Sequence, residues 1–107
     1  MIFAIDFDDT IHDTKSVPQG KKLGCPVEGA KESIAFLRDQ GHKVIIFSYW
    51  ATSDKVKIIE DWCVYFGIAV DEITNIKPKA HFYIDNLSVH FQTWNQTLRE
   101  IDKRLQI

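Results

Sequence analysis

The stretch MIFAIDFDDTIHDT, residues 1–14, decides the fold that we expect for this 107-residue chain. Residues 2–7 are almost wholly apolar, which is typical of a strand buried on both faces of a parallel sheet. Three carboxylates and a threonine then crowd the end of this run: Asp6, Asp8, Asp9 and Thr10. Because like charges this close repel one another, the pattern predicts that a positive group binds where the strand ends.

The composition is that of an ordinary globular chain, with 45% hydrophobic residues, 26% charged residues and a net charge of -2. This balance gives no general electrostatic reason to bind nucleic acid or a membrane surface. Asp6 stands where a signal peptide would need its apolar centre, so we do not expect the chain to be secreted. Cys25 and Cys63 do not form a CxxC pair, so we interpret them as reduced thiols. We expect one domain over residues 1–107, located in the cytoplasm.

Apolar runs alternate with helical patterns along the chain. We expect strands at residues 2–7, 43–47, 68–73 and 81–84, and helices at 28–40, from about 53 to 66, and from about 93 onward. Ser53 or Asp54 is expected to cap the second helix. The last helix carries an apolar stripe that we interpret as core, with a dimer face as the alternative: Trp94, Leu98, Ile101 and Leu105. The alternation predicts an α/β fold, a small parallel sheet with helices on both faces and right-handed crossovers.

Chemically active side chains follow several of these strands. Asp6 and Asp8 follow the first strand, Ser48 follows the second and Asp85 follows the fourth. Because ligands of such sheets bind outside the carboxyl ends of the strands, we expect these residues to converge on one acidic edge.

The converging residue types suit phosphoryl transfer. Carboxylate oxygens suit Mg²⁺, and an Asp can attack phosphorus to form an aspartyl-phosphate. Asp6 is the expected nucleophile. Asp8 can protonate the leaving oxygen and then activate water, while Ser48 and Lys77 donate to the phosphoryl oxygens. The expected metal ligands are Asp6, Asp8 and Asp85.

The order of these parts resembles the haloacid dehalogenase (HAD) superfamily. Its DxDx[TV] motif is similar to Asp6-Phe7-Asp8-Asp9-Thr10, its strand-end Ser or Thr to Ser48, its lysine to Lys77, and its acidic pair to Asp85-Asn86. The likeness runs from residue 2 to about residue 90. It implies a Rossmann-like three-layer sandwich, an Mg²⁺-dependent phosphomonoester hydrolase, and a backbone carbonyl of Asp8 on the metal. Thr10 would shape the turn that follows the motif.

Two positions depart from the family pattern. The second acid of the last motif is replaced by Asn86, which brings no charge, and we expect weaker metal binding from it. Lys79 lies two residues after Lys77 and stays open as the lysine of the motif. Residues 11–26 are long enough for a flap and too short for a helical cap, so the resemblance is to a capless member with a phosphorylated substrate of unknown class. Nucleic acid is a partner only if a polynucleotide end is the substrate.

Other interpretations stay open. A degenerate fold that binds phosphate or protein without catalysis is the main alternative, and Asn86 motivates it. A receiver domain is a further alternative. It is disfavoured because a receiver has its lysine last, whereas Asp85 follows Lys77 in this chain. Taken singly, each motif residue also suits an ordinary turn or cap. We interpret His12 as a surface or core residue, and as the one histidine that could contact substrate. Trp50 is interpreted as packing that could line the site.

Overall fold

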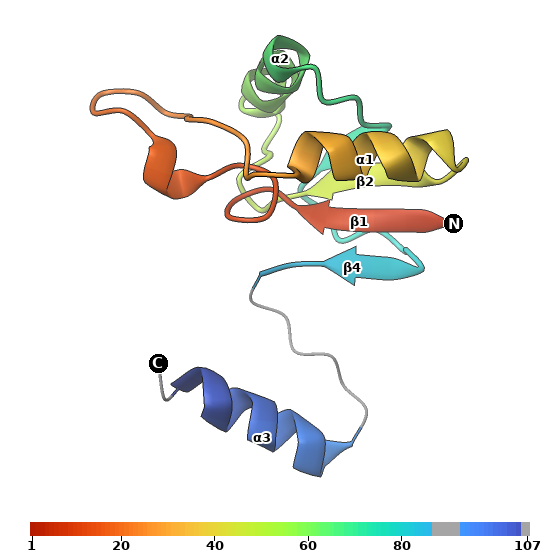
Figure 1. Ribbon diagram of the computed structural model, residues 1–107. Helices are drawn as coiled ribbons and strands as arrows, with labels where there is room; N and C mark the ends of the chain where they lie inside the picture. The colour runs from red at the N-terminus through yellow and green to blue at the C-terminus, as the bar shows by residue number, and fades with distance from the viewer. Residues whose placement is uncertain (87–92, 106–107) are drawn as a thin grey trace.

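The computed structural model describes residues 1–86 and 93–105 (Figure 1). The four strands are β1 (Ile2–Asp6), β2 (Lys43–Phe47), β3 (Glu72–Thr74) and β4 (Phe82–Ile84). The three α-helices are α1 (Ala30–Asp39), α2 (Val56–Phe66) and α3 (Trp94–Leu105). A short 3-10 helix, η1 (Thr14–Ser16), lies in the loop after β1. Within this described part of the chain, no helix has the length and apolar character needed to cross a membrane.

The strands form one parallel sheet in the order β3-β2-β1-β4. The central strand β1 pairs Ile5 with Ile46 of β2 and with Ile84 of β4. Because all strands run the same way, the residues that follow β1, β2 and β4 lie at one edge of the sheet. The α/β fold class, a small Rossmann-like sandwich, is therefore confirmed.

The main core lies between the sheet and the two helices α1 and α2. β1, the residue that follows it and β2 point a row of side chains to this side, and these pack against residues of both helices: Ile5, Phe7, Val44 and Ile46 against Ile34, Ile59, Trp62 and Cys63. Both crossovers move along the sheet in the same direction, from β1 to β2 and then to β3. Right-handed crossovers in one direction place their helices on one face, as Figure 1 shows for α1 and α2.

In Figure 1, α3 lies below the edge strand β4, away from α1 and α2. Its apolar stripe is not core, so that prediction is wrong: Trp94, Leu98 and Leu105 are 68%, 58% and 79% exposed. Only Thr97 of this helix is buried. A helical period determines which residues share a face, but the packing of the helix against other elements determines whether that face is covered.

Two further expectations need correction. The third strand begins at Glu72, because Ile68 is buried in the core and Asp71 first meets β2 through a 2.8 Å bond from its N–H to the carbonyl of Val44. Neither Ser53 nor Asp54 caps α2, which starts after Lys55 without a side-chain cap. The hydroxyl of Thr52 donates to the Asp54 carboxylate at 2.6 Å, so that carboxylate is already engaged.

Residues 11–26 form a loop that is closed at its base. The N–H of Val27 donates to the carbonyl of Ile11 at 2.7 Å, and the N–H of Asp13 donates to that of Cys25 at 2.9 Å. Between these two closing bonds the only helical element is the short turn η1, so the loop has the form of a flap without a helical cap. We call residues 11–26 the flap below.

Candidate active site at the carboxyl ends of the strands

The turn after β1 folds the chain back on itself. The carbonyl of Phe7 accepts N–H bonds from Ile11 at 2.9 Å and from His12 at 2.8 Å. Asp9 has a φ of 60°, in the left-handed region, and its carboxylate accepts bonds from the N–H and the hydroxyl of Thr14. The Thr14 hydroxyl bond is the main reason that the pKa of Asp9 is lowered. Asp9 is therefore a structural residue of this turn.

Thr10 lies in the same turn, as the resemblance implied. Its hydroxyl oxygen is buried and has no hydrogen-bond partner among the described residues.

Asp6 is the acid with the most unusual environment at this edge. Burial raises its pKa from 3.8 to about 6, and the negative charge of Asp85 adds to the effect, followed by those of Asp8 and Asp9. The register explains the contact, since Ile5 pairs with Ile84 and the next residues of β1 and β4 are Asp6 and Asp85. The structure thus brings together two of the acids that the sequence predicted at one edge.

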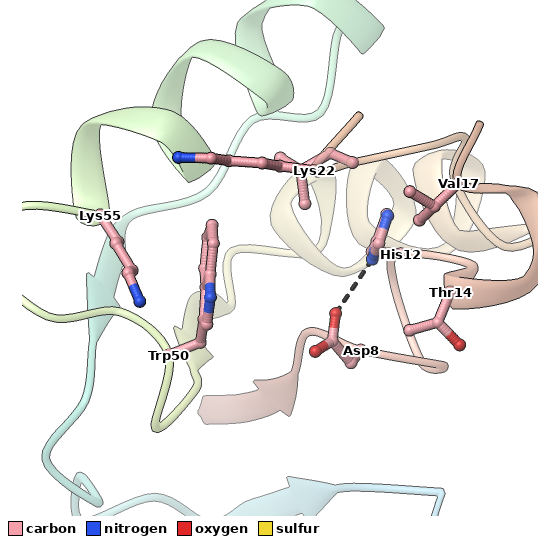
Figure 2. Close-up of a pocket in the computed structure, with 8 residues that line it drawn as sticks. Asp8, His12, Thr14, Val17, Lys22, Trp50 and Lys55 are labelled. Atoms are coloured by element: carbon pink, nitrogen blue, oxygen red, sulfur yellow. Dashed lines mark hydrogen bonds and ion pairs between the residues drawn. The ribbon is translucent and has the colours of Figure 1, made fainter. Parts of the chain in front are cut away.

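The Asp8 carboxylate is bound by a histidine. His12 Nδ1 lies 2.9 Å from Asp8 Oδ1, and the N–H of Gly24 donates to His12 Nε2 at 2.9 Å (Figure 2). Because Nε2 accepts this bond, we assign the ring proton to Nδ1, which then donates to Asp8. The carbonyl of Gly24 in turn accepts a 2.8 Å bond from the indole N–H of Trp62. A chain of hydrogen bonds therefore links α2, the flap and Asp8.

The ring of His12 is held on every side. It is only 2% exposed, stacks on Phe7 with ring centroids 5.1 Å apart, and meets the edge of Trp62 at 5.6 Å. The sequence placed His12 in the core or on the surface and did not identify this role. The one available signal was its position four residues after Asp8, which a tight turn can bring into contact.

Ser48 lies at the end of β2, as expected. It is 6% exposed, its N–H donates to the carbonyl of Thr74 at 3.0 Å, and its Oγ accepts a 3.2 Å bond from the N–H of Trp50. The hydroxyl is an acceptor in this bond, which leaves its proton able to donate to a ligand.

Lys77 is oriented differently from the other predicted site residues. Its ammonium lies 4.8 Å from the ring centroid of Tyr83, and it forms no salt bridge with Asp6 or another described acid. Tyr83 pairs with Ala4, on the face of the sheet away from α1 and α2. The structure does not bring Lys77 into contact with Asp6, and Lys79 is exposed.

A cavity of about 340 Å³ opens beside Asp8 and His12. The flap and the segment between β2 and α2 supply its other walls: Thr14, Val17, Lys22, Leu23, Trp50 and Lys55. In Figure 2, Trp50 stands between Lys55 and the Asp8–His12 pair. The Lys55 ammonium lies 5.4 Å from the centroid of the indole ring. Trp50 thus lines the cavity as well as packing on the core.

The acids of this edge suit a cation whose coordination is completed by other ligands. Among residues 1–86 and 93–105, no three His, Cys, Asp or Glu side chains lie close enough to hold a metal by themselves. Mg²⁺, however, is usually bound by one or two carboxylates together with water and substrate phosphate. The mutual repulsion of Asp6 and Asp85 is the observation that fits such an ion.

Comparison with known proteins yields the fold. No family model matches the chain, and no curated protein matches its sequence. A solved structure of a conserved protein coded by a locus from Bacteroides thetaiotaomicron is similar at a TM-score of 0.67 and 22% identity. The match covers 97% of this chain and 91% of that one. At this identity the likeness shows that the two chains share their fold.

Proposed function

We propose that the chain is an Mg²⁺-dependent phosphomonoester hydrolase that works through an aspartyl-phosphate on Asp6. The observation that carries the proposal is the pair of differently held acids after β1. Asp6 is a strand-end carboxylate in an acidic, half-buried position, and Asp8 is oriented by His12 at the mouth of a cavity. A nucleophile and a separate acid/base are the two carboxyl roles that this reaction needs.

In the first half-reaction, an oxygen of Asp6 attacks the phosphorus of the substrate. The bond from phosphorus to the leaving oxygen breaks, and the proton of the Asp8 carboxyl passes to that oxygen. In the second half-reaction, Asp8 takes a proton from water as the water oxygen attacks the phosphorus. The Asp6 carboxylate leaves, inorganic phosphate is released, and Asp8 is protonated again.

Three residues support these steps from fixed positions. The His12 Nδ1–H keeps one oxygen of Asp8 engaged, so the other is directed to the reacting atoms. The Ser48 hydroxyl donates to a phosphoryl oxygen from the end of β2. Asp6, Asp85 and the backbone carbonyl of Asp8 would hold Mg²⁺, which supplies charge neutralisation for the incoming phosphate. The roles of Lys77 and Lys79 as phosphate donors stay predictions.

The test is release of phosphate from p-nitrophenyl phosphate, with Mg²⁺ and with EDTA. We expect Asp6→Asn to lower kcat by about 10³-fold or more and Asp8→Asn by about 10²–10⁴-fold. Asp39→Asn, an exposed acid at the end of α1, is the matched control and should keep full activity. Borohydride reduction of enzyme quenched during turnover should convert residue 6 to homoserine, detected by mass spectrometry. Equal activity of Asp6→Asn and the unaltered chain would end the proposal.

A binding module without catalysis is the second candidate. The position of Lys77 over Tyr83 favours it, together with Asn86 in place of a second acid. Calorimetry separates the two functions. A chain that binds inorganic phosphate and Mg²⁺ but releases no phosphate from any ester is a binding module, and one that turns over is a hydrolase.

For the location of the protein, we keep the cytoplasm as part of the proposal. The support is chemical, because Cys25 is an exposed free thiol, which a reducing compartment preserves.

A further inference from the structure

The cavity beside Asp8 contains features that the proposed hydrolysis does not use. We propose that it is a pocket for the leaving group, and that it selects phosphomonoesters carrying a planar aromatic ring and a second anionic group. The assignment of the cavity to the leaving group and the kinetic test rest on the proposed function, whereas the binding of the ligand in the cavity does not. The ligand class is that of a nucleoside bisphosphate, defined by ring and charge.

The role of Asp8 indicates which part of the substrate the cavity holds. An acid that protonates the leaving oxygen lies next to that oxygen, so the rest of the leaving group extends into the space beside Asp8. That space is the cavity, because Asp8 and His12 form one of its walls. Its volume of about 340 Å³ is within the range of small-molecule sites, at about 300–1,000 Å³. A ring and a short linker fit in this volume.

Trp50 provides a surface on which an aromatic ring can stack. It is partly buried against the core, which limits the movement of its indole ring. Lys55 lies over the ring at 5.4 Å, and Figure 2 shows Asp8 and His12 beyond the opposite side of the ring. A planar ring that enters the cavity from this side can therefore lie against the indole. Val17 and Leu23 of the flap add apolar walls.

Two cations line the same cavity from different segments. Lys22 comes from the flap and Lys55 from the residue that precedes α2. Neither ammonium forms a salt bridge with any described acid. The hydrogen bond from Thr52 is the main cause that lowers the pKa of Asp54, and the positive charges of Lys55 and Lys22 add to it. Two ammonium groups at one cavity favour a ligand with an anionic group besides the phosphate that reacts at Asp6.

The kinetic test compares kcat/KM for adenosine 3′,5′-bisphosphate, adenosine monophosphate and glycerol phosphate. The unaltered chain should prefer the bisphosphate over glycerol phosphate by about 10²-fold, since ring stacking and charge both contribute. Trp50→Leu should lower kcat/KM for adenosine monophosphate, relative to kcat/KM for glycerol phosphate, about tenfold. Trp50→Phe should restore part of this preference. The double variant Lys22→Met/Lys55→Met should remove the preference for bisphosphate over monophosphate. Lys21→Met, which changes a flap lysine outside the cavity lining, is the matched control.

A binding test separates this inference from the proposed function. In the Asp6→Asn chain, calorimetry with the bisphosphate should show binding that Trp50→Leu weakens about tenfold while the unfolding temperature of the chain stays similar. Equal affinity with and without the indole, or equal kcat/KM for all three esters, would overturn the pocket. If the bisphosphate binds in this way but no ester is hydrolysed, the hydrolase proposal fails and the pocket stands.

Discussion

Asp6, Asp8 and Asp9 occupy neighbouring positions after β1, yet each carboxylate meets a different environment. Asp6 is partly buried and faces the charge of Asp85, which raises its pKa to about 6. Asp8 accepts a bond from His12, and Asp9 is held by Thr14 in the turn. At the residue scale, the repulsion expected from the sequence is thus relieved by a hydrogen-bond donor at two of the three acids and persists at the third. One acid stabilises the turn, one is oriented by a donor, and one keeps an unfavourable charge.

The charge on Asp6 should cost folding stability. A folded-state pKa of about 6, above the ordinary 3.8, means that the folded chain binds this proton more tightly than the unfolded chain. Stability from this group is therefore full below pH 4 and is lost as the pH rises through about 6. We expect Asp6→Asn to raise the free energy of unfolding at pH 7 by about 1–2 kcal/mol, less than the full pKa shift would give, because solvent screens a charge that is only partly buried. The gain should vanish near pH 3.5. Urea unfolding in EDTA measures both; a variant less stable than the original at pH 7 would contradict this account.

The two nitrogens of His12 can be tested separately. His12→Asn places an amide donor near the position of Nδ1 and loses the acceptor for Gly24, whereas His12→Gln reaches the Nε2 position and loses the donor for Asp8. Both variants lose the ring that stacks on Phe7, so their unfolding free energies should fall together. If His12 orients Asp8, the Asn variant should keep kcat about tenfold higher than the Gln variant. Equal kcat values in both would reduce His12 to a packing residue.

At the scale of elements, two helices build the core and the third does not. Ile59 of α2 is completely buried in the core, whereas Leu98 of α3 is 58% exposed. The helices were predicted from the same apolar spacing. The difference arises because α2 lies in the crossover between the neighbouring strands β2 and β3, which places its apolar face against the core.

This difference predicts unequal costs of truncation. We expect Ile59→Ala to lower the free energy of unfolding by about 2–4 kcal/mol, as is usual for a buried aliphatic side chain. Leu98→Ala should change it by less than about 0.5 kcal/mol, because a side chain that stays in solvent gains little from burial. Chemical unfolding of the two variants side by side is the measurement. A cost above about 1.5 kcal/mol for Leu98→Ala would show that the stripe on α3 is covered.

At the scale of the whole molecule, Asp71 ties α1, β2 and the segment before β3. Its carboxylate accepts the N–H of Val44 at 2.8 Å and a bond from Arg38 of α1 at 3.2 Å. The Val44 bond is the main cause that lowers the pKa of Asp71, and Arg38 adds to it. Both bonds are made at the amino end of β2, so they stabilise the sheet at the edge away from the candidate site.

We expect Asp71→Asn to lower the free energy of unfolding at pH 7 by about 1 kcal/mol, since an amide accepts less strongly than a carboxylate. Because the folded-state pKa is lowered, this stabilisation is present above the ordinary pKa near 4 and is lost as the pH falls through the folded-state pKa. The gap between variant and original should therefore close in acid. Activity at pH 7 should be unchanged, which a phosphate-release assay checks; Glu72→Gln, on the neighbouring residue, is a control for general charge effects.

The sequence by itself determined the α/β class, the four parallel strands, and the edge at which Asp6, Asp8, Ser48 and Asp85 lie. These follow from local information, because the period of apolar residues sets the element type and a parallel sheet places every carboxyl end on one side. The third strand and the second helix were predicted with the wrong starting residues, because Ile68 is buried in the core before the strand begins and the Asp54 carboxylate already accepts a bond from Thr52.

Only the tertiary structure decided how the site is supported and what surrounds it. His12, Gly24 and Trp62 are far apart along the chain, and their hydrogen bonds exist because the flap and α2 fold against the same turn. The cavity beside Trp50 and the exposure of α3 have the same origin. Contacts between distant segments depend on how the elements are placed in three dimensions, which residue spacing along the chain does not encode.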